Sequence, residues 1–584
     1  MENTQPSLAL VAIAGNCESY IRRFIESFQR LTPHIYIVRA CGSRDPDKTL
    51  DIAREMGCKV GEYKNAEAHQ FWDHVDNFGA ARQMAADMAE ADGHEWLMWA
   101  DTDDILESES ADIIREHLRI TAPETTLALV PYRLTNNGLN LLRERIWRRG
   151  TAVWADPVHE HLEPVDKSGD GHVRWEDCRI VHAPDSHKDE ADGKQGNQRN
   201  WRIISSIPDF DKNPRWLFYA SLEHFGFKDD ENGMAYAVEA LKTPGLDDNE
   251  RYELYLQLAM RTHDFAPKKS LLHEAYKVSP WRREALAQLA AVSLDNNEPQ
   301  DALAYARAFM AIPVPDVVPW THRPVVYGFG GVGLYACCLR ANGDTEKADK
   351  FELEWFKKCG GKISVCHPTR GRPLQAAETR KKWLEAAKDP QAIEYIFGFS
   401  ADDTETADIL GRFRHAQSAA GNLDAVGGTL VQNYNAAVRA SSGKIILTIQ
   451  DDLEPCLFWD ELIWKALANH LNRPAVLQVG DGYRNDDLLI TFCVTRPTLR
   501  AMNHNGGIVS DEYRGVFCDN EFTHRAKKNG WIVPSDIVLR HEHPFFNPAV
   551  PTDDIYAIEN SSEGYKFGLE VFRRRNPDAF DSQG

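Results

Sequence analysis

Long apolar runs, paired cysteines and a surplus of basic residues are all missing from this 584-residue sequence. No segment reaches the roughly 18 consecutive apolar residues of a membrane-spanning helix, and the first residues lack the basic start and apolar core of a secretory signal. The 11 cysteines are odd in number and none lies in a C-x-x-C pair. Neither a disulfide framework nor a zinc site fits this spacing, so we expect reduced, mostly buried thiols in a cytoplasmic protein.

Acidic residues outnumber basic ones, 88 to 67, which gives a formal net charge of −21. Such a surplus argues against a long polyanion as the default partner, although it leaves room for a local basic groove. The length exceeds that of one ordinary domain several-fold, so we expect roughly two to four domains. A hydrophobic fraction of 43% and a charged fraction of 27% are typical of a soluble globular protein.

The beginning of the chain alternates short apolar runs with helical patterns, as a layered α/β domain does. The runs 8–13, 35–38 and 96–99 predict buried strands. The segments 20–28 and 49–56 predict the helices that follow the first two strands.

Strands disappear between Trp201 and Gly361, where alanine-rich amphipathic helices alternate with short turns. Trp216 and Trp281 begin two similar stretches that are 65 residues apart, about twice the tetratricopeptide period. We therefore predict a short array of helical hairpins, with an irregular helical linker as the alternative.

The α/β pattern restarts after Gly361. From Ile13 to Asp101 in the first pattern is 88 positions, and from Val365 to Asp451 in the second is 86. In both patterns an acidic cluster follows an apolar run. We interpret this as one fold present twice, and we predict domains at 1–200, 201–360 and 361–584.

Carboxylates that directly follow a buried strand lie at the edge of the sheet where open α/β folds bind ligands. A divalent cation takes such oxygen ligands and can bridge a diphosphate. Asp101 and Asp103 are two residues apart, so in an extended segment they would point the same way, one to a ribose and one to a metal. A solvated turn or a helix cap is the alternative.

Several short motifs, in the same order in both halves, carry a family resemblance. They are Cys41-Gly-Ser-Arg-Asp45, Asn77-Phe-Gly-Ala-Ala-Arg82, Trp99-Ala-Asp-Thr-Asp-Asp104 and Trp154-Ala-Asp-Pro-Val-His-Glu160, then Thr369-Arg-Gly-Arg-Pro373, Asn433 to Gly443 and Val516-Phe-Cys-Asp-Asn-Glu521. Both halves resemble the nucleotide-sugar-binding fold of family 2 glycosyltransferases. The resemblance implies two GT-A (nucleotide-diphospho-sugar transferase, Rossmann-like) α/β domains with an all-α, tetratricopeptide-like domain between them.

The resemblance also implies roles for individual residues. Mn²⁺ or Mg²⁺ would be held by Asp103 and His182 in the first half, and by Asp452 and His541 in the second. The acceptor's proton would be taken by Glu160, with His159 beside it, and by Asp519, with Glu521 as the alternative. A nucleotide-sugar donor, in the first place a UDP-sugar, would contact Asp45, Arg82, Asp101, Thr369, Arg370, Arg372, Asp402, Asn433 and Asp451. For each of these residues the alternative is a structural or solvated side chain.

Two positions depart from the family pattern. Gln450 stands where the family usually carries its first acidic residue, which weakens the expected metal site of the second half. Ala40 stands where the family carries the aspartate that reads uracil, so the nucleotide of the first half is open.

The leading hypothesis is therefore an inverting, hexosyltransferase-like glycosyltransferase with two active sites. One alternative is a protein with one active and one degenerate domain, and another is an adaptor whose helical repeats bind a protein partner. A nucleotidyltransferase would share the fold but release pyrophosphate instead of a nucleoside diphosphate. The acceptor is open among a glycan, a lipid-linked glycan, a peptide and a modified DNA base, and the repeats could also mediate a homodimer.

Overall fold

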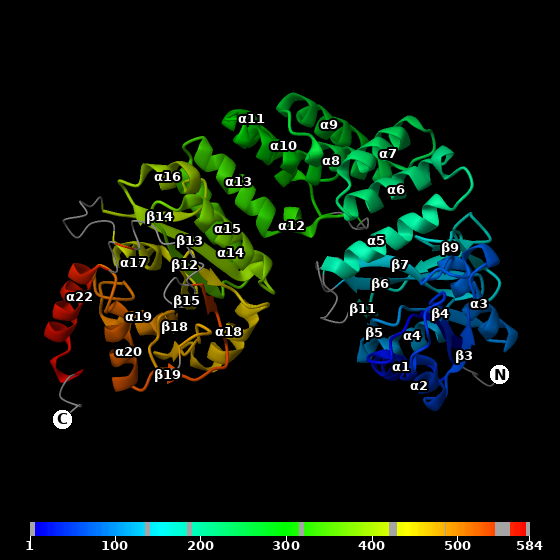
Figure 1. Ribbon diagram of the computed structural model, residues 1–584, viewed down its shortest axis with the longest axis horizontal. Helices are drawn as coiled ribbons and strands as arrows, with labels where there is room; N and C mark the ends of the chain where they lie inside the picture. The colour runs from blue at the N-terminus through cyan, green and yellow to red at the C-terminus, as the bar shows by residue number, and fades with distance from the viewer. Residues whose placement is uncertain are drawn as a thin grey trace. The chain divides into compact units, whose positions relative to one another are not determined.

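The computed structural model describes residues 6–134, 140–183, 190–314, 321–419, 429–484, 486–542, 557 and 561–579. The chain folds into two compact units, Met1–Leu286 with Ile312–Pro324, and Ala287–Ala311 with Val325–Gly584. Each unit contains one large mixed sheet with helices packed on it, together with part of a helical region (Figure 1). The expected architecture, two α/β sheets flanking paired helices, is confirmed.

The sheet of the first unit has the strand order β3-β2-β1-β4-β7-β6-β11-β5, with β10 beside β6. Its strands are β1 (Leu8–Ala14), β2 (Ile35–Arg39), β3 (Lys59–Glu62), β4 (Trp96–Trp99), β5 (Asp104–Leu106), β6 (Leu127–Leu134), β7 (Asn140–Arg148), β10 (His172–Arg174) and β11 (Ile180–His182). Strands β8 (Ala152–Ala155) and β9 (His161–Pro164) form a separate hairpin. The central strand β1 is parallel to β2 and β4, which brings their carboxyl ends to one edge.

Strand β1 is apolar throughout because both of its faces are covered. Leu8, Leu10 and Ala12 pack with residues of α1 (Ile21–Gln29), α2 (Thr49–Glu55) and α4 (Ser108–Ile120). Ala9 and Val11 pack on the other face with α3 (Phe78–Ala91). The strands and helices expected in this region are confirmed, with ends that move by one residue.

In the helical region, several consecutive helices pack against each other in pairs. Its helices are α5 (Glu190–Ser205), α6 (Pro214–Gly226), α7 (Asp230–Lys242), α8 (Asp248–Arg261), α9 (Phe265–Val278), α10 (Glu284–Asp295), α11 (Pro299–Ala311), α12 (Pro324–Tyr327), α13 (Phe329–Ala341) and α14 (Thr345–Lys358). Helices α6, α8 and α10 start 34 and 36 residues apart, which is the tetratricopeptide spacing. The two compact units divide this region between them.

The sheet of the second unit has the order β14-β13-β12-β15-β18-β17-β19. Its strands are β12 (Ile363–Pro368), β13 (Ile393–Ser400), β14 (His415–Ser418), β15 (Ile445–Thr448), β17 (Val476–Leu477), β18 (Cys493–Thr495) and β19 (Ile532–Val533). Strands β16 (Leu453–Glu454) and β20 (Arg540–His541) pair separately. The helices are α15 (Pro373–Glu385), α16 (Thr404–Leu410), α17 (Leu430–Ala440), α18 (Trp459–Leu467), α19 (Arg496–Met502), α20 (Cys518–Lys528) and α22 (Ser562–Arg575).

The two sheets repeat one another strand for strand around their centres. Strand β1 lies between β2 and β4, with Leu8 opposite Trp96, and β12 lies between β13 and β15, with Ile363 opposite Ile445. The strand that follows in each sheet, β7 or β18, is antiparallel. This repeated topology bears out the interpretation of one fold present twice.

All 11 cysteines are free thiols, and nine of them are buried, as the spacing predicts. None of the helices in the described parts of the chain combines the length and the apolar character that a membrane span requires.

Candidate active sites

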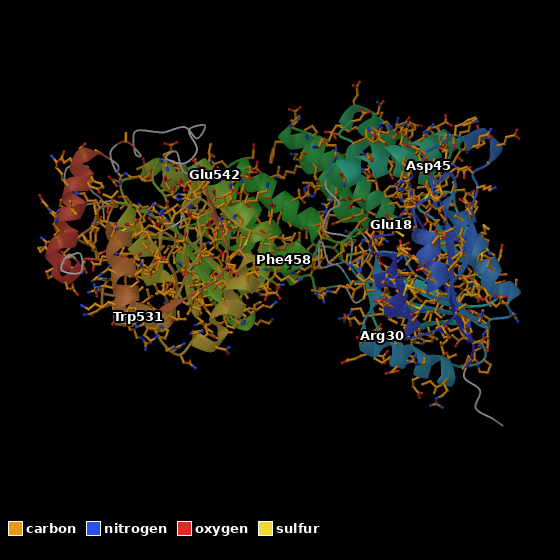
Figure 2. All side chains as sticks on the ribbon, turned by 60° about the horizontal axis from the view of Figure 1, so that its bottom comes forward. Glu18, Arg30, Asp45, Phe458, Trp531 and Glu542 are labelled. Atoms are coloured by element: carbon orange, nitrogen blue, oxygen red, sulfur yellow. The ribbon has the colours of Figure 1, made fainter. Side chains whose placement is uncertain are left out.

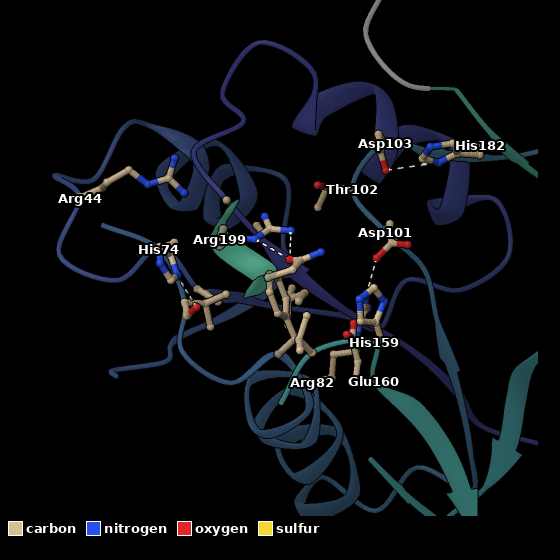
Figure 3. A pocket seen from close by; sticks show the side chains of 18 of the residues that line it. Arg44, His74, Arg82, Asp101, Thr102, Asp103, His159, Glu160, His182 and Arg199 are labelled. Atoms are coloured by element: carbon tan, nitrogen blue, oxygen red, sulfur yellow. Dashed lines mark hydrogen bonds and ion pairs between the residues drawn. The ribbon is translucent and has the colours of Figure 1, made fainter. Parts of the chain in front are cut away.

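A cavity of about 430 Å³ opens at the carboxyl ends of β1, β2 and β4 in the first unit (Figure 3). Six residues singled out from the sequence line it, namely Arg82, Asp101, Asp103, His159, Glu160 and His182. Asp45 is not among the lining residues, and its side chain is exposed at the surface of this unit (Figure 2). The predicted set is therefore largely brought together in one place.

The acidic segment after β4 is a tight turn and not an extended strand. The backbone N–H of Asp104 donates to the carbonyl of Asp101 at 2.9 Å, and the N–H of Asp101 donates to the Asp104 carboxylate at 3.0 Å. The expectation that Asp101 and Asp103 point the same way is therefore wrong. The Asp101 carboxylate meets Arg82 at 2.6 Å, whereas Asp103 faces His182 at 3.6 Å.

Asp103, Asp104 and His182 form a group that fits a metal ion. One ligand atom from each lies within 4.8 Å of the others. Strand β11 pairs with β5 so that His182 stands opposite Asp104, and its Nδ1 lies 3.2 Å from Asp104 Oδ1. Two carboxylates and an imidazole suit Mn²⁺ better than Mg²⁺. Burial disfavours the charged form of His182, but the hydrogen bond with Asp104 and the nearby acids outweigh it and raise its pKa.

Asp104 is also a structural hub, a role that sequence reasoning missed. It is fully buried beside Arg145, itself fully buried, with 3.3 Å between Arg145 Nη1 and Asp104 Oδ2. Tyr132 donates its hydroxyl to Asp104 at 2.8 Å. The Arg145 guanidinium stacks over Trp99, 3.7 Å from the ring centre. The only sequence signal is an acid at the first position of an apolar strand, directly after Asp-Thr-Asp.

Arg82 is enclosed by carboxylates and aromatic rings. It donates to Glu160 at 2.8 Å and to Asp101 at 2.6 Å, and its guanidinium lies over Trp99 and Trp154. Only 7% of the residue is exposed. This arrangement favours a positioning role toward the two carboxylates over the expected direct contact with a diphosphate.

Arg82→Met is expected to lower the thermal midpoint by roughly 5 °C near pH 7, because two carboxylates lose their shared cation. Burial opposes ionisation of Asp101, but Arg82, Arg145 and His182 lower its pKa to about 2. Because the pKa of Asp101 is lower in the folded protein than in the unfolded chain, its ionised form stabilises the fold at pH values above about 4. This stabilisation is lost as the pH falls toward 2. The difference in thermal midpoint between Arg82→Met and wild type should therefore shrink in acid.

Thermal unfolding between pH 2 and 7 measures this difference, and a difference that stays constant with pH would contradict the stabilisation of Asp101 by Arg82. Exposed Arg119→Met is the control.

The segment that carries Glu160 is held in an unusual backbone conformation. Asp156 and His159 have φ of 70° and 51°, which ordinary side chains rarely adopt. The N–H of Phe78 donates to Pro157 at 2.7 Å, and a Cβ on Gly79 would lie 2.4 Å from the Asp156 carbonyl oxygen. Backbone held in this way is common at functional sites, and here it directs Glu160 toward Arg82.

His159 and Glu160 are neighbours in sequence, but their side chains take different partners. The His159 ring stacks on Tyr219 with centroids 3.8 Å apart, and its Nε2 lies 2.6 Å from Glu223. Both partners belong to α6. The structure thus favours Glu160 over His159 as a proton acceptor, because the imidazole is occupied by Glu223.

The second unit repeats the acidic turn. The N–H of Leu453 donates to the carbonyl of Gln450 at 3.2 Å, and Leu453 stands opposite His541. His541 Nε2 lies 3.2 Å from Asp452, so these two predicted metal ligands meet. The N–H of Glu542 donates to the Asp452 carbonyl at 2.9 Å, as that of Ala183 does to Asp103 in the first unit. Leu453 occupies the place of Asp104, so this turn offers one carboxylate fewer.

Asp451 turns inward and not toward a ligand. Its carboxylate lies 2.8 Å from His367 Nε2 and accepts from the Thr369 hydroxyl at 3.2 Å. His367 is fully buried, and its Nδ1 lies 2.7 Å from the hydroxyl of Tyr395. Arg372 Nη1 is 4.0 Å from the same carboxylate. This placement favours Asp451 as a support for the Thr369–Pro373 loop over its expected role as a donor ligand.

The remaining predicted donor contacts hold that loop as well. Arg370 pairs with Asp402 at 3.2 Å. Asn433 is buried inside α17, where its amide donates to the carbonyl of Thr369 at 3.2 Å. It lies within the helix, whereas Asn77 caps the start of α3.

Asp519 and Glu521 lie on the first turn of α20 in contrasting environments. Glu521 is 2% exposed and is bound by Arg575 at 2.8 Å and by the Tyr513 hydroxyl at 2.8 Å. This network favours a structural role over that of a catalytic base. Asp519 is half-buried, and burial raises its pKa above the ordinary value although backbone hydrogen bonds and Arg484 oppose the shift.

The sequence matches no protein-family model and no curated protein. Among solved structures, that of S. aureus TarS 1-349 aligns with 46% of this chain and 91% of its own, at 13% identity and a TM-score of 0.25. That of the MamA protein aligns with 28% of this chain and 84% of its own, at 13% identity and a TM-score of 0.24. Similarity at this identity and TM-score carries no inference about function.

Proposed function

We propose that the protein is a metal-dependent glycosyltransferase that moves a sugar from a nucleotide-sugar donor to an acceptor, with inversion and with two active sites. The observation that carries the proposal is the repeated placement of an acidic turn against a strand-end histidine, Asp103 with His182 and Asp452 with His541. The domains are proposed at 1–200 and 361–584, with the helices of 201–360 between them. The motif resemblance supports the same reading.

In the first half, Asp103, Asp104 and His182 would hold Mn²⁺. Bound there, the ion would neutralise the charge that builds on the departing nucleoside diphosphate. Glu160 would accept the proton of the attacking acceptor hydroxyl, and Arg82 fixes the orientation of its carboxylate. The cavity of about 430 Å³ is large enough to bury a small ligand.

In the second half, Asp452 and His541 would hold the ion and Asp519 would accept the proton. The raised pKa of Asp519 suits a base, because a less acidic carboxyl group takes a proton more readily. The buried pair of His367 and Asp451 would keep the Thr369–Pro373 loop in place for the nucleotide-sugar.

A protein with one active and one degenerate half is the second candidate, and Leu453 and Gln450 favour it. Leu453 removes a carboxylate from the metal group, and Gln450 bonds the Tyr434 hydroxyl at 2.8 Å where the first half pairs Asp101 with Arg82. Reduced metal affinity in the second half would follow. An adaptor whose repeats bind a protein, or a second copy of the chain, is the remaining alternative. The acceptor is proposed only as a glycan, a peptide or a modified base.

The deciding experiment measures release of nucleoside diphosphate by the full chain with Mn²⁺ and a panel of UDP-, GDP- and dTDP-sugars. Wild type is compared with Asp103→Ala and Asp452→Ala. We expect each variant to lose turnover of its own donor by about 100-fold, because the leaving group loses charge stabilisation. Loss in one variant only would identify a single active half. Release of pyrophosphate, or no turnover together with no metal-dependent nucleotide binding, would refute the proposal.

A further inference from the structure

Acidic and basic side chains both line the cavity of the first unit. Asp101, Asp103 and Glu160 line it, and so do Arg44 and Arg199. Figure 3 shows Arg44 on the opposite side of the cavity from Asp103, with Arg199 between them. Such a separation of charge suits a ligand that carries its own negative group at a distance from the metal-binding end.

The acids of the cavity already have cationic partners. Arg82 bonds Asp101 and Glu160, and His182 lies beside Asp103. These three carboxylates are therefore already engaged by cations, although Glu160 also acts electrostatically on Arg199.

The two arginines lack such partners. Arg199 donates from Nε and Nη2 to the neutral amide oxygen of Asn200, at 3.1 and 2.9 Å, and Arg44 donates to the carbonyl of Cys41 at 3.4 Å. In the described parts of the chain, no carboxylate forms an ion pair with either guanidinium. The nearest acid of α6, Glu223, bonds His159 at 2.6 Å and Asn200 at 3.1 Å.

Arg199 is held as a binding group would be. It is half-buried on α5, and its guanidinium lies over the Phe78 ring, 4.8 Å from the centre, which restrains its plane. Burial lowers its pKa, and nearby Arg44 acts in the same direction, although Glu223 and Glu160 oppose the shift. Arg44 is exposed to solvent and Arg199 is half-buried, so the repulsion between them is partly screened, and an anion bound between the two guanidinium groups would relieve it. A planar guanidinium pairs best with phosphate or carboxylate oxygens.

We propose that Arg44 and Arg199 form a phosphate-binding subsite in the first cavity. Arg199 comes from α5, which spans the proposed boundary at residue 200, so the helix that joins the α/β domain to the helical region contributes to this site. The inference deepens the proposed function of the first half, on which it rests for the identity of the whole ligand. The phosphate is either the diphosphate of the donor or a phosphate group of the acceptor.

The test measures anion binding to the full chain by calorimetry, in the Asp452→Ala background that disables the second metal site. The probes are pyrophosphate with Mn²⁺, and inorganic phosphate with Mn²⁺ and saturating UDP. Arg199→Gln and Arg44→Gln are compared with Arg202→Gln, a control one helical turn further along α5. Arg202 stacks on Trp72 and lies outside the lining of the cavity. Arg199→Lys keeps the charge without the planar fork.

We expect Arg199→Gln and Arg44→Gln to lower the affinity for at least one of the two probes by about tenfold, because a charge-assisted contact is lost. Arg202→Gln should leave the affinity for both probes unchanged. Loss confined to pyrophosphate assigns the donor diphosphate, and loss confined to phosphate assigns an acceptor group. Unchanged affinities in both cavity variants, or no binding of either probe to wild type, overturn the proposal. The binding measurement does not depend on turnover. If the protein turned over no donor but still bound phosphate in a way that depends on Arg199, the proposed function would be refuted and the phosphate-binding subsite would remain supported.

Discussion

Asp103→Asn and Asp104→Asn are expected to fail in different ways, although the two residues are adjacent in one turn. Asp103 is accessible from the cavity and its carboxylate faces His182. Its loss should reduce metal-dependent donor turnover of the first half by about 100-fold while the thermal midpoint moves by no more than about 2 °C. The residue contributes to the metal group and little to the core.

Asp104→Asn should lose metal-dependent turnover and stability together. The carboxylate and Arg145 are both fully buried, so neutralising one leaves the other as an uncompensated charge. Breaking such a pair costs about 3 kcal/mol or more, which lowers the thermal midpoint of a unit of this size by roughly 5 °C or more. The hydrogen bond from Asp101 N–H, which closes the turn, would also weaken.

Differential scanning calorimetry and manganese titration of the two variants separate these expectations. Asp112→Asn serves as the control, because that carboxylate lies on α4 with 82% of its side chain exposed. Equal stability losses in the variants at 103 and 104 would show that the burial of Asp104 does not matter. Unchanged manganese affinity in both would remove the metal group from the proposed function.

Much of the fold could be predicted because its signals are local. Runs such as 8–13 and 96–99 are apolar along their whole length because they form central strands of a mixed sheet that is covered on both faces. The spacing of the helical pairs follows from the length of a helical hairpin, so it can also be recognised from the sequence. The match between the two sheets follows from the near-equal distances between their motifs.

The direction of individual side chains was not predictable in the same way. Asp101 and Asp103 diverge because a single backbone hydrogen bond, from Asp104 N–H to the Asp101 carbonyl, makes the segment a turn. Asp451 faces inward because His367 lies beneath it, 84 positions earlier in the chain. Arg199 reaches the cavity from a helix about 100 residues after the acidic turn. Contacts of this kind depend on tertiary packing, which the spacing of motifs in the sequence does not reveal.

The two halves differ most where the chemistry would take place. The first half pairs Asp101 with Arg82 and adds Asp104 to the metal group, whereas the second has Gln450 against Tyr434 and Leu453. A neutral pair replaces a charged one, so the second site carries a weaker field at the same place in the fold. Different donors, or unequal rates, are the expected consequence of this asymmetry.

In the second half, Asp519→Asn and Glu521→Gln are expected to separate catalysis from stability. Asp519 is half-buried with a raised pKa, and a proton acceptor of this kind contributes a factor of about 100 or more to the rate. Its amide cannot accept the proton, so turnover of the second-half donor should fall by that factor. The thermal midpoint should change little, because Asp519 forms no ion pair among the described residues.

Glu521→Gln should show the reverse. Its carboxylate joins α20 to α22 through Arg575 and also bonds Tyr513 and Arg525, all around a side chain that is 2% exposed. Removing the charge leaves Arg575 with Glu512 as its remaining carboxylate partner and should cost about 2 kcal/mol of unfolding free energy, less than the loss of a fully buried pair. Activity per folded molecule should stay within about twofold of wild type.

Unfolding in urea and donor turnover, measured on the same preparations, decide between these roles. Asp511→Asn is the matched control, an exposed acid nearby in sequence that pairs with Arg439. If Glu521→Gln lost turnover while its unfolding midpoint stayed at the wild-type value, Glu521 would be the base and Asp519 would not. The buried pair with Arg575 argues for the opposite result, because a carboxylate held by four hydrogen bonds, from Arg575, Tyr513 and Asn576, is poorly placed to take a proton from an acceptor hydroxyl.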